Sequence, residues 1–477
     1  MAIKTPNQYM KSLEKAKPKA YIHGELVEDL YNHPMLMPSV NSMKLTYSVS
    51  SLAEWQAKST LLDGEPISLW TSPYFSKDAL KKKVDLERML GRMTGSCFQR
   101  CVGMDMISAA WSATYDVDQA KGTEYHKRFK EWLKHVQKND LAIAGVMSDV
   151  KGDRSKRPTQ QKDPDMFLHV VEKKKDGIVV RGAKAHITGA LMMHELFVLP
   201  TQTMRPGEED YAVAFCIPNN TKGIIHILGR VPSDTRRLEP ELMDTGNIDY
   251  GAGSHETLII FDDVFVPWER VFLCGETDHS MDTVWRFAAY HRENGCKAGV
   301  FDTLVGATAL AAEYNGLSNA GHIKDKISDM LINTEALYAC SVAASTLALE
   351  HPSGIFLANP IYASCMKNLG SKWVYEMCNH AHDICGGIVV TMPSEKDLRS
   401  PEVGKYVNKY LKGVAEVDTE DRMKIIRYIE NLTMGPMQVE ICVGAGPSQA
   451  ERNVIRNVLP LEEYKKYARK LAKIKSK

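Results

Sequence analysis

Four side chains in two distant segments place the strongest constraint on how this chain can fold. Cys97 and Cys101 lie in the first quarter of the sequence, whereas His291 and Cys296 lie in its second half. Thiolate and imidazole are ligands that many transition metals prefer, so three thiols and one imidazole favour a buried metal centre that forms when the two segments fold together. Cysteine pairs at this spacing are also common as ordinary core residues, and the spacing alone leaves both interpretations open.

The spacing within each pair makes a structural prediction. Residues four apart on an α-helix share one face about one turn apart, so Cys97 and Cys101 suit one compact centre and not a disulfide within a regular helix. His291 and Cys296 are five apart, which is roughly 140° around a regular helix. They converge only if the helix is interrupted, and Gly295 is placed to allow such a break.

The composition is that of an ordinary soluble protein. Of the 477 residues, 44% are hydrophobic and 25% are charged, and the formal net charge is +1. This balance gives no electrostatic reason to expect a nucleic acid or an acidic membrane surface as a partner. No stretch reaches the roughly 18 apolar residues of a membrane-spanning helix, and no signal peptide is recognisable. We therefore expect a cytoplasmic protein whose ten cysteines are reduced thiols.

The pattern of apolar residues divides the chain into three parts. We predict an N-terminal helical domain (1–140), a β domain that binds flavin (141–275) and a C-terminal helical domain (276–477). Amphipathic runs predict helices at 81–90, 123–137, 296–314, 322–349 and 361–382. Short β-branched segments between turn residues predict strands at 166–171, 177–182, 211–217, 223–228 and 256–261.

Several motifs resemble a known family of flavoproteins. They are Ser96–Asp105, Lys151–Arg154, Val179–Gly189, Phe261–Pro267, Gly386–Glu395 and Gly444–Gly446. The last five are similar to the flavin-dependent 4-hydroxyphenylacetate 3-monooxygenases, and the cysteines with His291 resemble the 4-hydroxybutyryl-CoA dehydratase branch of that group. The resemblance covers nearly the whole chain. It implies an α+β, acyl-CoA dehydrogenase-like fold, with a helical domain, a β domain and a helical bundle, assembled as a homotetramer.

The same resemblance implies a reaction. The family uses FAD and a [4Fe-4S] cluster to convert 4-hydroxybutyryl-CoA into crotonyl-CoA, and it also isomerises vinylacetyl-CoA. The C3 proton of such a CoA thioester is not acidic, and the family solution is a transient one-electron oxidation by FAD after the C2 proton has been removed. By the resemblance, Cys97, Cys101 and Cys296 hold three irons. His291 binds the fourth iron, which acts as a Lewis acid, and also serves as the base.

Further residues match family positions that contact substrate or cofactor. The implied catalytic residues are Glu440, Glu256, Lys297 and Gln99. The implied FAD-binding residues are Ser148, Asp149, Lys151, Arg154, Thr188, Gly189 and, from a neighbouring subunit, Gly386 and Gly387. Taken singly, each also fits an ordinary solvated charge or turn residue. No Rossmann or P-loop glycine motif supports a different nucleotide site.

One segment departs from the family pattern. The family has a longer segment between the histidine and the third cysteine, with a tyrosine to which an acid/base role is assigned. Here His291-Arg-Glu-Asn-Gly-Cys296 contains no tyrosine. Either this subtype works without it or another group, Glu440 or His291, replaces it.

Two other functions remain open from the sequence. One is an oxygen-using flavin monooxygenase on the same fold, in which the cysteines have no role in the chemistry. The other is a non-catalytic electron-transfer or sensor protein that uses the cluster only as a redox centre. An exchangeable histidine ligand argues against the second.

Overall fold

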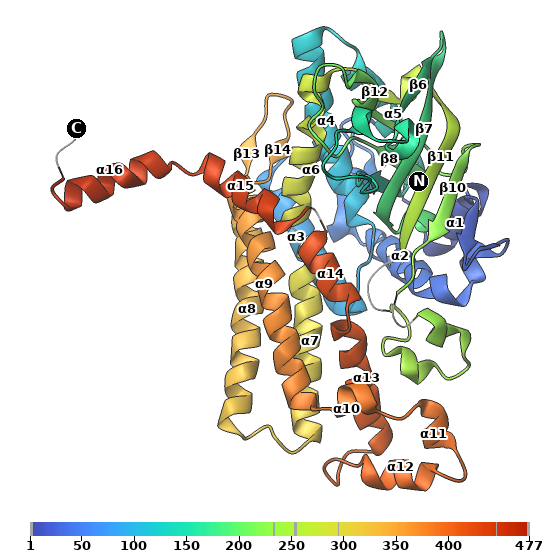
Figure 1. Ribbon diagram of the computed structural model, residues 1–477, viewed down its shortest axis with the longest axis vertical. Helices are drawn as coiled ribbons and strands as arrows, with labels where there is room; N and C mark the ends of the chain where they lie inside the picture. Colours follow the sequence, from blue (N-terminus) through green and yellow to red (C-terminus); the bar gives the residue numbers. More distant parts are fainter. Residues whose placement is uncertain (1–2, 232–233, 252–254, 294, 445, 475–477) are drawn as a thin grey trace.

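Two β-sheets lie beside a bundle of long helices in the computed structural model, which describes residues 3–231, 234–251, 255–293, 295–444 and 446–474 (Figure 1). The helices before the bundle are α1 (Pro6–Lys15), α2 (Met37–Ser50), α3 (Lys77–Thr94), α4 (Cys101–Lys121) and α5 (Tyr125–Asn139). Those of the second half are α6 (Asp282–Arg292), α7 (Cys296–Tyr314), α8 (Gly321–Thr346), α9 (Pro360–Cys385), α10 (Ile388–Thr391), α11 (Glu395–Arg399), α12 (Gly404–Tyr410), α13 (Thr419–Thr433), α14 (Pro436–Val443), α15 (Ser448–Val458) and α16 (Leu461–Leu471).

The larger sheet has six strands in the order β2-β1-β10-β11-β7-β6, and the smaller has four in the order β12-β9-β8-β5. Their strands are β1 (Ala20–Ile22), β2 (Glu25–Leu26), β5 (Ile143–Val146), β6 (His169–Lys173), β7 (Gly177–Thr188), β8 (Glu195–Val198), β9 (Val213–Pro218), β10 (Ile224–Leu228), β11 (Glu256–Pro267) and β12 (Val271–Cys274). Two small hairpins add β3 (Gln56–Lys58) with β4 (Pro66–Ser68), and β13 (Leu349–Glu350) with β14 (Phe356–Leu357). The antiparallel pair β7–β11 sets Glu256 opposite Thr188.

The five predicted strands and five predicted helices are each confirmed as elements of that type. The N-terminal part also contains short strands that were not predicted, and one of them, β1, pairs in parallel with β10 and joins the large sheet. Strands of two to four residues, such as β1 and β5, are too short to show a period in the sequence. The boundaries of the three predicted domains stay a prediction.

Helices α3 and α7 meet backbone to backbone. A Cβ atom at Gly299 would lie 2.2 Å from the carbonyl oxygen of Arg88, and one at Gly91 would lie 2.5 Å from the carbonyl oxygen of Cys296. Only glycine permits this approach, since real Cβ atoms do not come so close to backbone. The crossing of these two helices therefore fixes where α7 begins, and with it the position of Cys296.

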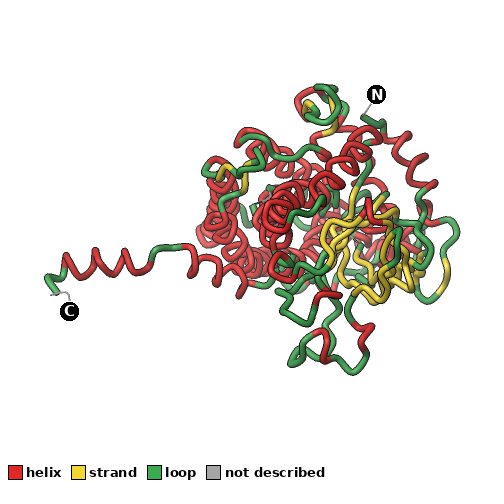
Figure 2. The backbone as a smooth tube through the Cα atoms, turned by 90° about the horizontal axis from the view of Figure 1, so that it is seen from above, coloured by secondary structure: helices red, strands yellow, loops and turns green. Residues whose placement is uncertain are grey.

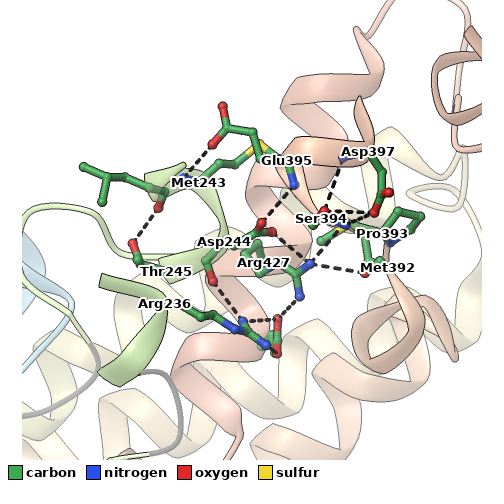
Figure 3. A network of polar contacts seen from close by, with 12 residues as sticks. Arg236, Met243, Asp244, Thr245, Met392, Pro393, Ser394, Glu395, Asp397 and Arg427 are labelled. Carbon is green, nitrogen blue, oxygen red and sulfur yellow. Dashed lines mark hydrogen bonds and ion pairs between the residues drawn. The ribbon is translucent and has the colours of Figure 1, made fainter. Parts of the chain in front are cut away.

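A polar network fastens the segment before β11 to the C-terminal helices (Figure 3). The Asp244 carboxylate accepts a hydrogen bond from the backbone N–H of Glu395 at 2.9 Å and pairs with Arg427 at 3.0 Å. Arg236 pairs with Glu430 on α13 at 3.0 Å. The side chains of Asp244 and Arg427 are largely buried, and ion pairs of this kind hold a defined geometry when further hydrogen bonds satisfy them.

The last helix, α16, projects away from the rest of the chain (Figures 1 and 2). None of its residues is buried, and Leu461, Tyr464, Tyr467 and Leu471 expose about half or more of their surface. Among the described residues, no helix combines the length and apolar character needed to cross a membrane.

Candidate active site

The two cysteines of the first pair do not share a helix. Cys101 is the first residue of α4, whereas Cys97 lies in the loop after α3. Two left-handed residues turn the chain here, Gly95 with φ 56° and Gln99 with φ 72°. The predicted placement on one helix face was therefore wrong, and Gln99 does not lie on a helix either.

The predicted interruption between His291 and Cys296 is confirmed. Helix α6 ends at Arg292 and α7 begins at Cys296. Gly295 adopts an ordinary φ of −76°, so its role is not a left-handed turn. A Cβ there would lie 2.1 Å from the carbonyl oxygen of Val84, so the glycine allows close packing on α3. Residue 294 of this segment lies outside the described residues, as does residue 445 of the Gly444–Gly446 motif.

The structure brings the three thiols together. Burial raises the pKa of Cys97 and of Cys101 well above the ordinary value and raises the pKa of Cys296 to about 12. Cys296 raises the pKa of both other thiols, and Cys97 raises that of Cys101, so all three lie within electrostatic reach. Thiols with a raised pKa ionise at neutral pH only when a cation binds among them. A cysteine ligand of a metal must be in this ionised form.

The His291 ring is held by a buried carboxylate. Its Nδ1 donates a hydrogen bond to Oδ2 of Asp105 at 2.9 Å, and the Phe287 ring stacks on it with centroids 5.3 Å apart. Burial lowers the pKa of His291 despite the opposing effect of Asp105. A neutral imidazole with Nδ1–H engaged leaves Nε2 as the nitrogen that can bind a metal.

Sequence reasoning did not single out Asp105. This residue is fully buried and also accepts hydrogen bonds from the Tyr74 hydroxyl and the Lys83 ammonium, each at 2.8 Å. Burial raises the pKa of Asp105, but Lys83 and His291 outweigh that effect, and the net pKa is below the ordinary value. The sequence did carry a signal, because Asp105 is a single carboxylate within an apolar helical run. It follows Cys101 by four residues and therefore lies on the same helix face.

No three of the donor atoms of Cys97, Cys101, Cys296 and His291 all lie within 4.8 Å of one another. Among the described residues, the one group of three or more His, Cys, Asp or Glu ligand atoms within 4.8 Å of one another is Asp329, Glu376 and His380, on α8 and α9. The thiols and His291 form no such group. Ligands of a cube-shaped iron–sulfur cluster bind different irons and stand further apart than ligands of one ion.

The predicted catalytic residues gather around the thiols. Glu440, half-buried on α14, lies within electrostatic reach of Cys97 and Cys296. Glu256 also reaches Cys97 and accepts a hydrogen bond from the Thr188 hydroxyl at 2.8 Å.

Lys297 and Gln99 complete this group. The Lys297 ammonium is buried, has no hydrogen-bond partner among the described residues, and lies within reach of Cys296 and Cys101. A positive charge there would stabilise the thiolate forms of these two cysteines. Gln99 is buried, and its amide donates to the Ser39 hydroxyl at 2.7 Å.

The predicted flavin residues fall into two places. The turn that carries Ser148, Asp149, Lys151 and Arg154 follows β5 and lies against β7, where Asp149 pairs with Lys184 at 2.5 Å. Thr188 ends the same strand and Gly189 follows it, and a Cβ at Gly189 would lie 2.6 Å from the side-chain oxygen of Gln99. Gly386 and Gly387 are exposed and lie between α9 and α10. In Figure 1, α10 lies toward the opposite end of the molecule from β7.

Comparisons with known proteins define the family. Residues 5–273 match the family model for the 4-hydroxyphenylacetate 3-hydroxylase N terminal, and residues 280–473 match that for the C terminal. The chain therefore belongs to the 4-hydroxyphenylacetate 3-hydroxylase family. It is 42% identical to the 4-hydroxybutyryl-CoA dehydratase/vinylacetyl-CoA-Delta-isomerase of Clostridium aminobutyricum over 99% of both chains. The predicted resemblance to that branch is confirmed.

Solved structures agree with this assignment. The oxygen-tolerant archaeal 4-hydroxybutyryl-CoA dehydratase from N. maritimus has a TM-score of 0.96 and 40% identity, covering 100% of this chain and 96% of that one. The oxygenase component of 4-hydroxyphenylacetate 3-monooxygenase, complexed with FAD, has a TM-score of 0.86 at 23% identity over 98% of both chains, which shows a shared fold. A glutaryl-coenzyme A dehydrogenase superposes with a TM-score of only 0.53, so the predicted acyl-CoA dehydrogenase likeness is weak.

Proposed function

We propose that this protein is an enzyme that removes water from 4-hydroxybutyryl-CoA to give crotonyl-CoA, and that it also isomerises vinylacetyl-CoA. The observation that carries the proposal is the proximity of three thiols, one buried and two half-buried, to Asp105, the carboxylate that holds Nδ1 of His291. The relative that is 42% identical is a dehydratase/isomerase, which supports the same reaction.

The donor set fits a [4Fe-4S] cluster held by Cys97, Cys101, Cys296 and Nε2 of His291. FAD is proposed against the turn from Ser148 to Arg154 and against Thr188 and Gly189, beside the thiols. When bound, FAD supplies one-electron redox chemistry and the cluster supplies a Lewis-acidic iron. The Gln99 side chain packs so closely on Gly189 that a Cβ there would lie 2.6 Å from its oxygen. This packing supports a site in which the proposed flavin side and the proposed cluster side adjoin.

The overall reaction sets the number of proton transfers that the side chains must perform. C2 and C3 of the substrate each lose a proton, C4 loses hydroxide and gains a proton, and the remaining proton leaves with the hydroxide as water. We assign removal of the C2 proton to Nε2 of His291 when this nitrogen is released from iron, and the Asp105 carboxylate then stabilises the positive charge on the ring. We assign to Glu440 the removal of the C3 proton and the protonation of C4, the acid/base role of the tyrosine that this chain lacks.

The remaining side chains are assigned to binding and orientation. Lys297 offers an ammonium to the negative charge that develops on the substrate or cluster. Gln99 orients the substrate, and Glu256 links the cluster side to Thr188. We propose a homotetramer in which Gly386 and Gly387 of a neighbouring subunit contact FAD. Both glycines are exposed, and a Cβ at either would meet no atom of another described residue within 4 Å, chain neighbours aside. Their surface could therefore accept another chain.

Anaerobic purification followed by assay tests the proposal. The expected protein is brown, contains about four irons per chain and FAD, and forms crotonyl-CoA from 4-hydroxybutyryl-CoA. A colourless protein that hydroxylates 4-hydroxyphenylacetate with reduced FAD would instead establish the monooxygenase. An iron–sulfur protein that turns over neither CoA thioester would leave the non-catalytic redox function.

A further inference from the structure

Three ionisable side chains are buried beneath the turn between α6 and α7. Lys83 and Glu87 lie one turn apart on α3, and Asp105 lies on α4; each is 0% exposed. We call these three residues the polar clamp. Lys, Glu and Asp are almost never fully buried unless they are paired, so the clamp requires an explanation beyond packing.

The clamp contacts both sides of the turn that carries His291 and Cys296. Lys83 donates a hydrogen bond to the carbonyl oxygen of Tyr290 at 2.6 Å, directly before His291. Asp105 accepts from the His291 ring at 2.9 Å. Glu87 accepts from the backbone N–H of Gly295 at 2.9 Å, directly before Cys296.

Its members are also joined to one another. The Lys83 ammonium lies 2.8 Å from Asp105 and 3.9 Å from Glu87, and the Tyr74 hydroxyl donates to Asp105 at 2.8 Å. Well-packed apolar residues often stabilise a fold as much as such a buried ionic group does. A group that binds a helix-end carbonyl, a ring nitrogen and a helix-start N–H is better explained by positioning.

We propose that Lys83, Glu87 and Asp105 are positioning residues that hold His291 and Cys296 at a fixed separation before any iron binds. Asp105 in addition selects Nε2 of His291 as the iron-facing nitrogen by engaging Nδ1–H. The ligand set is thus organised by the protein and not by the metal. This inference rests on the proposed function, because it takes His291 and Cys296 as ligands of the cluster.

The test compares full-length variants after anaerobic reconstitution with iron and sulfide. Asp105→Asn removes the charge behind His291, and Glu87→Leu removes the acceptor of the Gly295 N–H. Glu87→Gln keeps an acceptor and serves as the conservative rescue. Glu195→Gln is the matched control, since Glu195 is a buried carboxylate that accepts from Trp132 and Arg270, each at 2.7 Å, outside the clamp.

Four readouts separate positioning from folding: nitrogen hyperfine coupling, reduction potential, iron affinity and amide exchange at Gly295. We expect Asp105→Asn to weaken the nitrogen hyperfine coupling of the reduced cluster in pulsed EPR and to raise its reduction potential, because the ligand becomes a poorer donor. Outer-shell losses typically lower metal affinity by about 10- to 100-fold, and we expect a loss of that size in Glu87→Leu but not in Glu87→Gln or Glu195→Gln. Amide exchange at Gly295 in the metal-free chain should be slow in wild type and fast in Glu87→Leu.

Unchanged nitrogen coupling and potential in Asp105→Asn, together with wild-type iron affinity in Glu87→Leu, would overturn the proposal. If Asp105→Asn does not fold, Tyr74→Phe decides the question: a smaller shift of coupling and potential in the same direction supports the clamp, and no shift overturns it. A wild-type protein that forms no cluster defeats the proposed function instead. In that case, amide hydrogen exchange at Gly295 in the metal-free chain still shows whether the clamp holds the turn between α6 and α7.

Discussion

The Thr188 hydroxyl donates a hydrogen bond to the Glu256 carboxylate at 2.8 Å, across the paired ends of β7 and β11. This contact joins a residue on the proposed flavin side to one within reach of Cys97. It links the two halves of the site through two strands.

We expect Thr188→Val to lower the rate of dehydration at least tenfold. A hydrogen bond to a charged group contributes about 1.5–3 kcal/mol, and roughly 1.4 kcal/mol in the barrier is tenfold in rate. Steady-state turnover of 4-hydroxybutyryl-CoA measures the effect. Thr308→Val is the control, because among the described residues the buried Thr308 hydroxyl bonds only the Leu304 carbonyl of its own helix. Equal losses in the two variants would contradict the prediction.

His291→Cys should keep a cluster but lose dehydration. With four thiolate ligands, the fourth iron has no exchangeable ligand position for the substrate hydroxyl. The substitution also removes the proposed base, and loss of a positioned base typically costs a factor of about 10²–10⁴ in rate. Iron content and anaerobic turnover are measured on the same sample. Near-normal activity with the cluster intact would refute the double role of His291.

Glu440→Gln should lower the dehydration rate by about 10²–10⁴-fold, the usual cost of removing a positioned acid or base. The amide keeps the shape of the carboxylate, so FAD and iron content should match wild type. Glu463→Gln, on the exposed helix α16, controls for loss of a carboxylate elsewhere. A near-normal rate would point to His291 acting alone, and lost FAD would make Glu440 structural.

Isomerisation of vinylacetyl-CoA should outlast dehydration when the protein is exposed to air. Isomerisation needs only removal of the C2 proton and protonation at C4, so it does not depend on departure of hydroxide. The two rates are followed in parallel with cluster absorbance during oxygen exposure. Loss of both activities at the same rate would contradict this expectation.

Gly295→Ala should destabilise the fold and reduce bound iron. Its Cβ would lie 2.1 Å from the Val84 carbonyl oxygen, and overpacking of this kind typically costs about 1–3 kcal/mol. A Cβ at Gly306, within α7, would meet no described atom outside the helix backbone within 4 Å. Gly306→Ala should therefore stabilise the fold by about 0.5–1 kcal/mol, the helix propensity difference. Urea unfolding and iron analysis of both variants test the contrast.

The long periodic elements and the break before Cys296 were predictable from sequence because local patterns encode them. The loop that carries Cys97 was not. Its left-handed Gln99 is held by the side chain of Ser39 on α2, a contact between residues that no local pattern relates. The hydrogen bond from His291 to Asp105 was likewise hidden, because it depends on how α6 packs against α4.

The backbone contact between α3 and α7 gives the proposed metal ligands unequal freedom to move. No side-chain layer separates Gly91 from the Cys296 carbonyl, so rotamer changes in the surrounding core cannot shift the main chain of Cys296. His291 is held through a ring hydrogen bond, which a rotation of one side chain can break and remake. The main chain is thus fixed beside both ligands, but only His291 also depends on a ring hydrogen bond for its orientation. This asymmetry would suit the proposed centre, in which one ligand exchanges.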